Sequence, residues 1–157
     1  VEVPSHAAGV KIGESMRTAR NARTGVSADV HAFHDEMRET MGELRMEPAL
    51  SHRSVNAGFS GGEKKRSEIL QMRMLKPRYA ILDEPDSGLD VDALRTMVRA
   101  ISDAARGGMG ILFITHSPKI LSHLAAQDIS VLMNGRIVCA GGKEVAEEIE
   151  KKGFGAL

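Results

Sequence analysis

Two short apolar runs and the helical pattern between them constrain the fold most. "YAILD" (79–83) and "ILFIT" (111–115) flank residues 90–105, in which apolar residues recur at spacings of three and four. That spacing predicts an amphipathic helix, and the two runs are short enough to be buried strands. Strand, helix and strand in this order predict an α/β protein whose mostly parallel sheet is flanked by helices.

The rest of the chain is predicted to be largely helical, with a β-hairpin near its end. Asn134-Gly135 between the apolar segments 129–133 and 136–140 is the strongest two-residue signal for a hairpin turn. Loops are expected at residues 5–13 and 49–59. Helices are expected at 14–23 and 144–151, from Gly62 to about Leu75, and starting at Pro118. A further helix is expected to start at Val30, with Ser27 or Asp29 as its cap, and to end at Pro48.

Composition narrows the class of protein. The 157 residues include 21 Lys+Arg and 21 Asp+Glu, so the net charge of zero gives no electrostatic argument for nucleic acid as a partner. No apolar run approaches the length of a membrane span, so direct membrane insertion is not expected. The single cysteine, Cys139, excludes an internal disulfide and a CxxC motif, which fits a reducing, cytoplasmic location.

Asp83 and Glu84 stand where the first apolar run ends. Ligands of parallel α/β sheets bind at the carboxyl ends of strands. An acid at such a position can hold Mg²⁺, and a second acid beside it can orient and deprotonate an attacking water. The alternative is that both acids simply leave the strand and face solvent, as most charged residues do.

Ser60, Gly61 and Gly62 precede a helix whose first turn carries three cations, Lys64 to Arg66. Glycines let backbone N–H groups approach an anion closely, and the helix dipole favours negative charge at this end. The alternative is an ordinary capping box, because Ser60 and Glu63 have the S-x-x-E spacing. A capping box explains neither the pair of glycines nor the cations, whereas a bound triphosphate would.

His116 follows the second apolar run and so also stands at the carboxyl end of a predicted strand. An imidazole there can hydrogen-bond a phosphate or an attacking water. The alternative is an ordinary loop histidine.

The order of these features along the chain resembles the ABC-type ATPase family. "FSGGE" (59–63) resembles its signature motif, usually written LSGGQ, and "YAILD" with Glu84 resembles the Walker B strand and catalytic glutamate. "SGLD" (87–90) resembles the D-loop, and His116 the switch histidine. The resemblance implies a P-loop NTPase fold of the ABC ATPase type, here incomplete.

Longer segments resemble the SufC-type ATPases of the SUF iron–sulfur cluster assembly machinery. They are "RSVNAGFSGGEKKRSEILQM" (53–72), "ILDEPDSGLDVDAL" (81–94), the tail from "NGRIV" through "EEIEKKGFGAL", and the opening "VEVP", which resembles the segment after the Q-loop glutamine. The resemblance implies ATP and Mg²⁺ as cofactors. It also implies a head-to-tail dimer with a second ATPase subunit, and SufB/SufD-type scaffold proteins as partners that dock near residues 1–55.

The resemblance also assigns roles to single residues. It implies that Ser60, Gly61, Gly62 and Glu63 contact a nucleotide held by the other subunit and that Asp90 crosses the dimer interface. It implies Asp83 as the Mg²⁺ ligand and Glu84 and His116 as catalytic residues.

Two family motifs are missing from the sequence, the phosphate-binding loop and the Q-loop glutamine, which is expected upstream of Val1. No G-x-x-x-x-G-K-[ST] stretch, the loop that cradles the β- and γ-phosphates, occurs in the 157 residues. The chain therefore resembles the later part of a SufC-type protein, divided into a helical subdomain with the signature motif (1–75) and the remainder of the core (76–157). The family fold places the P-loop strand between the strand before His116 and the strand at 129–133, so we expect a gap there. We expect residues 1–157 alone to be inactive and poorly soluble.

Two other functions fit part of the pattern. A nucleotide-binding subunit of an ABC transporter would share all five motifs. A truncated, non-catalytic module that docks on a scaffold would explain the missing phosphate loop, but it would have no need of Asp83, Glu84 and His116.

Overall fold

The computed structural model describes residues 7–55 and 58–154. These residues form two compact units, divided between Phe113 and Ile114. The resemblance at "VEVP" and the last residues of the tail lie outside this part of the chain. The α/β fold class predicted from the sequence is confirmed. The division at residues 75 and 76 concerns domains of the complete protein and stays a prediction.

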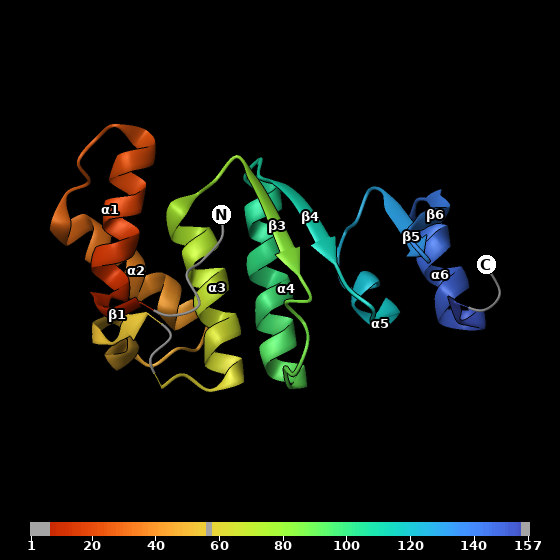
Figure 1. Ribbon diagram of the computed structural model, residues 1–157, viewed down its shortest axis with the longest axis horizontal. Coiled ribbons are helices and arrows are strands. Elements are labelled where there is room, and N and C mark those ends of the chain that lie inside the picture. The colour runs from red at the N-terminus through yellow and green to blue at the C-terminus, as the bar shows by residue number, and fades with distance from the viewer. Residues whose placement is uncertain (1–6, 56–57, 155–157) are drawn as a thin grey trace. The chain divides into compact units, whose positions relative to one another are not determined.

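Helix α3 (Gly61–Leu75) is the centre of the first unit. It contacts α1 (Ile12–Thr24), α2 (Val30–Glu43) and α4 (Val91–Arg106), as Figure 1 shows. A helix surrounded in this way is apolar on more than one side. Its buried residues are Ser67, Ile69, Leu70, Met72, Met74 and Leu75.

The helix starts and ends largely follow the sequence signals. Asp29 caps α2, because its carboxylate accepts the backbone N–H of Ala32 at 2.8 Å. The helix ends at Glu43, before Pro48, which opens a short 3₁₀ helix, η1 (Pro48–His52). Lys76 takes a left-handed conformation (φ 47°) at the end of α3, directly before Pro77.

The two expected loops contain a small sheet, so the prediction of loop there was wrong. Strand β1 (Ala7–Lys11) pairs antiparallel with β2 (Ser54–Val55), with an irregular register. "AAGVK" carries no alternation of apolar and polar residues, so the strand depends on a partner more than forty residues away along the chain. Backbone pairing of this kind leaves no local sequence signal.

The predicted strand–helix–strand unit is present. Strands β3 (Tyr79–Asp83) and β4 (Gly110–Ile114) are neighbours and point in the same direction in Figure 1, with α4 as the connection. Gly110 donates its N–H to the carbonyl of Arg78 at 3.0 Å. A Cβ atom at this glycine would lie 2.6 Å from the Tyr79 ring, so only glycine allows the ring to lie against the strand.

The two strands are less buried than the sequence predicts. Tyr79 and Ile81 are 67% and 70% exposed, and Leu112 is 56% exposed, whereas Ala80 between the first two is buried. Side chains of a strand alternate between the two faces of the sheet. One face therefore packs against helix, whereas the side chains on the other face are largely exposed, with the Arg78 guanidinium 5.3 Å from the centroid of the Tyr79 ring.

The second unit is a hairpin with a helix packed on it. Strands β5 (Ile129–Met133) and β6 (Arg136–Gly141) pair antiparallel, and both turn residues, Asn134 and Gly135, have positive φ. This confirms the predicted Asn-Gly hairpin. Its core residues are Ile129, Val131, Val145, Ala146 and Ile149, the last three from α6 (Lys143–Lys152); the short α5 (Pro118–Leu121) precedes the hairpin.

The interruption of the sheet expected between the strand before His116 and the strand at 129–133 stays a prediction. Strands β4 and β5 belong to separate two-stranded sheets. In residues 7–55 and 58–154, no helix combines the length and the apolar character that crossing a membrane requires.

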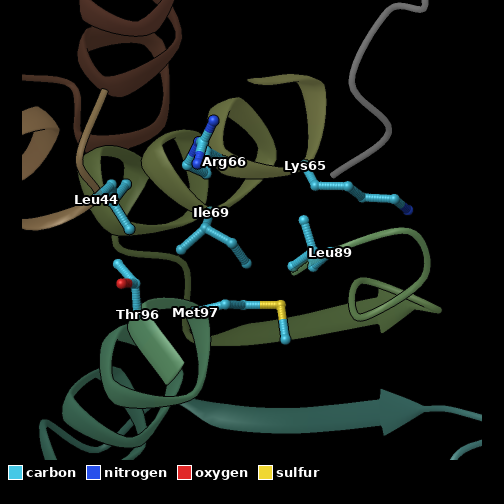
Figure 2. A pocket seen from close by; sticks show the side chains of 7 residues that line it. All are labelled: Leu44, Lys65, Arg66, Ile69, Leu89, Thr96 and Met97. Carbon is cyan, nitrogen blue, oxygen red and sulfur yellow. The ribbon is translucent and has the colours of Figure 1, made fainter. Parts of the chain in front are cut away.

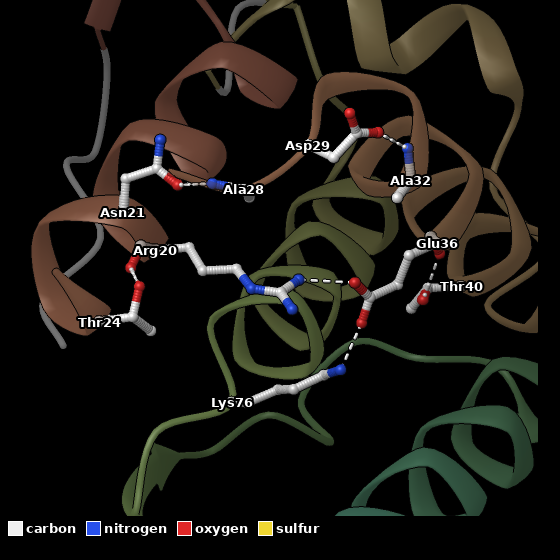
Figure 3. A network of polar contacts seen from close by, with 9 residues as sticks. All are labelled: Arg20, Asn21, Thr24, Ala28, Asp29, Ala32, Glu36, Thr40 and Lys76. Carbon is white, nitrogen blue, oxygen red and sulfur yellow. Dashed lines mark hydrogen bonds and ion pairs between the residues drawn. The ribbon is translucent and has the colours of Figure 1, made fainter. Parts of the chain in front are cut away.

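A charge network ties the helices of the first unit together (Figure 3). Glu36 of α2 accepts hydrogen bonds from Arg20 of α1 at 2.6 Å and from Lys76 at 2.5 Å. Partial burial acts to raise the pKa of Glu36, but the bonds from Lys76 and Arg20 outweigh it and hold that pKa below its ordinary 4.5. Glu36 is therefore ionised near neutral pH and links three elements.

We expect Glu36→Gln to destabilise the first unit by about 1 kcal/mol, because half-exposed ion pairs are screened by water. A lowered folded pKa stabilises the native state above the ordinary pKa of 4.5, and this contribution is lost as the pH falls through the folded value. The difference between wild type and variant in thermal unfolding should therefore be full at pH 7 and shrink below pH 4.5. Asp35→Asn removes a carboxylate from an exposed pair with Arg38 and should change little. An equal loss in both variants would contradict this account.

Candidate functional site

The tip of α3 is built by a capping box. The hydroxyl oxygen of Ser60 accepts the backbone N–H of Glu63 at 3.3 Å, and the Glu63 carboxylate accepts the backbone N–H of Ser60 at 2.8 Å. The hydrogen bond from the Ser60 backbone, more than any other contact, lowers the pKa of Glu63. The capping-box interpretation of Ser60 and Glu63 is thus confirmed, and it leaves the two glycines unexplained.

Gly61 and Gly62 are not required by the packing of the described chain. Neither has a positive φ, and a Cβ added at Gly61 would meet no atom within 4 Å. At Gly62 the nearest atom would be Nη2 of Arg66, at an ordinary contact distance of 3.8 Å. Glycine is a poor helix former, so a pair of them at a helix start has a cost that packing does not offset. Their effect is to leave the N–H groups of the tip open to close approach by another molecule.

Cations surround this tip. Lys64 is exposed, Lys65 lies 3.8 Å from Glu68, and the Nε atom of Arg66 is buried without a hydrogen-bond partner. Arg53, which precedes β2, also lowers the pKa of Glu63 through its charge. The first turn of α3 therefore carries three cations together with the Glu63 carboxylate. The sequence did not identify Arg53, because a single basic residue before the motif carries no pattern.

The segment after β3 returns to the first turns of α3. Figure 2 shows Leu89 with Lys65, Arg66 and Ile69 around a small apolar pocket, which Leu44, Thr96 and Met97 complete. Asp90 follows Leu89 directly and caps α4, accepting the backbone N–H of Ala93 at 2.7 Å. The segment that resembles the D-loop and the segment that resembles the signature motif thus lie together in one unit.

Asp83 and Glu84 lie at the end of β3, and both are exposed. Glu84 has a φ of 44°, the left-handed region that residues with a side chain seldom adopt. Such a conformation costs about 1–3 kcal/mol and is enriched at functional sites, although Arg45, Lys76 and Asn134 also adopt it at turns and helix ends of this chain. The buried Pro85 and the hydrogen bond from Ser87 N–H to the Glu84 carbonyl, at 3.2 Å, help to fix it. The sequence indicates the two acids but not this backbone conformation.

A shallow groove runs between α3 and β3. Its lining includes Met72 and Leu75 of the helix, Tyr79 and Ile81 of the strand, and the carboxylates of Glu68 and Asp83.

The donors at this end of β3 fit a Mg²⁺ ion that shares its ligands with a substrate. Mg²⁺ is usually bound through one or two carboxylates, several waters and substrate phosphates. Among the described residues no group of three or more His, Cys, Asp and Glu residues could hold a metal ion, so a cage made of protein alone does not fit. Asp83 together with the oxygens of a phosphate fits such an ion.

The structure groups the residues singled out in the sequence into two sets. Ser60 to Glu63, Asp83, Glu84 and Asp90 all belong to the first unit. His116 belongs to the second, where it is exposed and follows Thr115, whose hydroxyl accepts the N–H of Ser117 at 2.9 Å.

A strand–helix–strand unit whose first strand ends in two acids, together with a glycine-led helix tip, is typical of nucleotide-handling α/β proteins. The sequence profile described as "ABC transporter" matches residues 4–87, more than half of the chain, and an AAA-domain profile matches residues 69–122. The chain belongs to the ABC transporter ATPase family.

Individual relatives agree with this assignment. "Vegetative protein 296" of Bacillus subtilis is 42% identical over 156 residues, which are 98% of this chain and 60% of that protein. "Probable ATP-dependent transporter ycf16" of Cyanophora paradoxa is 41% identical over 157 residues, 98% of this chain and 61% of the relative. The chain thus spans about 60% of the length of the curated relatives that it matches.

Solved structures share the fold. "Structure of ATP binding subunit of ABC transporter" is 26% identical, with a TM-score of 0.73 over 98% of this chain and 62% of the other. "Dimeric Structure of MJ0796, a Bacterial ABC Transporter Cassette" also has a TM-score of 0.73, at 14% identity over 87% of this chain and 58% of the other. The fold is therefore that of an ABC ATPase of the P-loop NTPase class.

Proposed function

We propose that the complete protein is the ATP-binding and ATP-hydrolysing subunit of a complex that assembles iron–sulfur clusters. Closure of two such subunits on ATP would remodel a SufB/SufD-type scaffold. The observation that carries the ATPase part is the open, glycine-led tip of α3, whose two glycines have no role in the packing of the described residues. The assembly part rests on the SufC-like segments at 53–72 and 81–94.

In this proposal the tip of α3 completes the nucleotide site of the other subunit. Backbone N–H groups at Ser60, Gly61 and Gly62, with the positive end of the helix, neutralise part of the γ-phosphate charge. This use explains the cations of the first turn, which repel the helix end when no anion is bound. A related cassette solved as a dimer with ADP and Pi supports a two-subunit arrangement.

In this proposal the acids at the end of β3 take part in ATP hydrolysis. Glu84 accepts a proton from the attacking water. Asp83 holds Mg²⁺, which supplies positive charge to the phosphates when bound. His116 steadies the γ-phosphate, and Asp90 lies at the interface between the two subunits.

The cluster itself would be held by the scaffold. Cys139 is the only cysteine of the 157 residues, and iron–sulfur clusters are normally held by several thiolates. The scaffold would dock on the helical part, about residues 1–55, and closure of the dimer would move it.

Capture of partners tests the assembly function. The protein, expressed in its own host with every residue that its reading frame encodes, should retain scaffold proteins that carry iron and labile sulfide. Recovery of membrane permease subunits instead would contradict the proposal.

That second outcome is the competing function, an ATP-binding subunit of an ABC transporter. The names of relatives favour it, among them "Probable ABC transporter ATP-binding protein SpyM3_0208" of Streptococcus pyogenes, which is 38% identical. The SufC-like segments favour cluster assembly over transport.

Residues 1–157 alone should hydrolyse no ATP above background, because the sequence holds no phosphate-cradling loop and Glu84 then has no positioned phosphate to act on. They should also aggregate, since Tyr79, Ile81, Leu132 and Ile137 are all at least 65% exposed. A phosphate-release assay on the purified chain measures the ATP hydrolysis. Sustained turnover that Glu84→Gln abolishes would show that the chain is active, and the expectation would be wrong.

A further inference from the structure

The centre of the α3 tip already holds a negative group. The Glu63 carboxylate accepts the backbone N–H of Ser60 at 2.8 Å, at the end of the helix where an anion is favoured. The N–H groups of Gly61 and Gly62 belong to the first turn, where an α-helix offers no acceptor of its own. Ser60 N–H would be the next donor for a phosphate, and Glu63 occupies it.

The charges around Glu63 are those of an anion site. The charges of Arg53 and Arg66 both act on its carboxylate and help to lower its pKa. The buried Nε of Arg66 has no hydrogen-bond partner. Two guanidinium charges therefore act on the one carboxylate at this tip, and a nitrogen atom of one of them makes no hydrogen bond.

We propose that Glu63 is an internal competitor of the nucleotide, a carboxylate that stands where a phosphate oxygen binds and that must yield its hydrogen bond before the subunits close. This inference rests on the proposed function and adds to it a residue that sets the ATP concentration at which closure occurs. Glu63 stabilises the free helix tip and opposes the arrival of a second negative group. Its carboxylate is ionised near neutral pH, and the lowered pKa extends this to more acidic pH.

Glutamine separates the two effects, because its amide oxygen can still accept the N–H of Ser60 while the charge is gone. In the complete protein carrying Glu84→Gln to block hydrolysis, we expect Glu63→Gln to lower the ATP concentration for half-maximal dimerisation about three- to tenfold. Analytical ultracentrifugation over a series of ATP concentrations measures it. The gain should shrink in 0.5 M NaCl because salt screens exposed charges.

Glu14→Gln is the matched control, since Glu14 is an exposed acid in the first turn of α1. It should shift the midpoint less than about twofold, because Glu14 belongs to α1 and not to the α3 tip, and exposed charges are screened. A midpoint for Glu63→Gln that is unchanged or higher, in a parent that dimerises with ATP, would overturn the role of Glu63 alone. A parent that does not dimerise with ATP at all would overturn the proposed function together with this inference.

Discussion

Replacing Glu84 with Gln should leave ATP binding intact and lower the rate of ATP hydrolysis at least about a hundredfold, the usual contribution of a general base. The amide has nearly the shape of the carboxylate but cannot accept the proton of water. The backbone of Glu84, with φ at 44°, imposes the same strain on both side chains, so the fold should not change. Calorimetric titration with ATP and a phosphate-release assay on the complete protein give the two quantities.

Asp92→Asn is the control for this experiment. Asp92 is an exposed acid in the first turn of α4, about 4 Å from Arg45 and Arg95. Its removal should leave both binding and turnover close to wild type, because such exposed pairs contribute little. Normal turnover in Glu84→Gln would exclude Glu84 as the base.

The second large effect is expected at Gly62. An aspartate there should abolish ATP-driven dimerisation in the Glu84→Gln background, because its carboxylate would stand before the N–H groups meant for phosphate. The same substitution should not destabilise the protein, since an acid in the first turn of a helix is favourable and a Cβ at Gly62 meets only Arg66, at 3.8 Å. Dimerisation by ultracentrifugation and thermal unfolding by circular dichroism separate the two outcomes.

Gly62→Ala tests size without charge. It should stabilise the helix by up to about 1 kcal/mol, as the change from glycine to alanine usually does, and should weaken dimerisation less than aspartate. Full ATP-driven dimerisation of the aspartate variant would mean that the α3 tip does not face a triphosphate.

Sequence patterns predicted much of this fold because the corresponding signals are local. Asp29 as a cap, Asn134-Gly135 as a turn, and the apolar runs before Asp83 and His116 are each decided by neighbouring residues, and all correspond to elements of the structure. The pairing of β1 with β2 was missed because it joins distant segments through backbone groups that any residue supplies. The exposure of Tyr79 and Ile81 was missed because a run of apolar residues does not reveal which of its faces is covered.

The candidate site shows the same difference between features decided by neighbouring residues and features decided by three-dimensional placement. Spacing identified Ser60 to Glu63, Asp83 and Glu84, and the comparisons give the family to which such a pattern belongs. The left-handed backbone of Glu84, the contact of Leu89 with α3 and the open space before Gly61 depend on three-dimensional placement. These three features define the α3 tip and the end of β3 as the places where substitutions test the proposed ATPase function.

A structure of the complete Glu84→Gln protein with ATP and Mg²⁺ tests the central claim most directly. We expect backbone N–H groups of residues 60–62 within hydrogen-bond distance of a γ-phosphate bound by the opposite subunit. A nucleotide-bound dimer in which these residues face solvent, or any surface away from the triphosphate, would contradict the account.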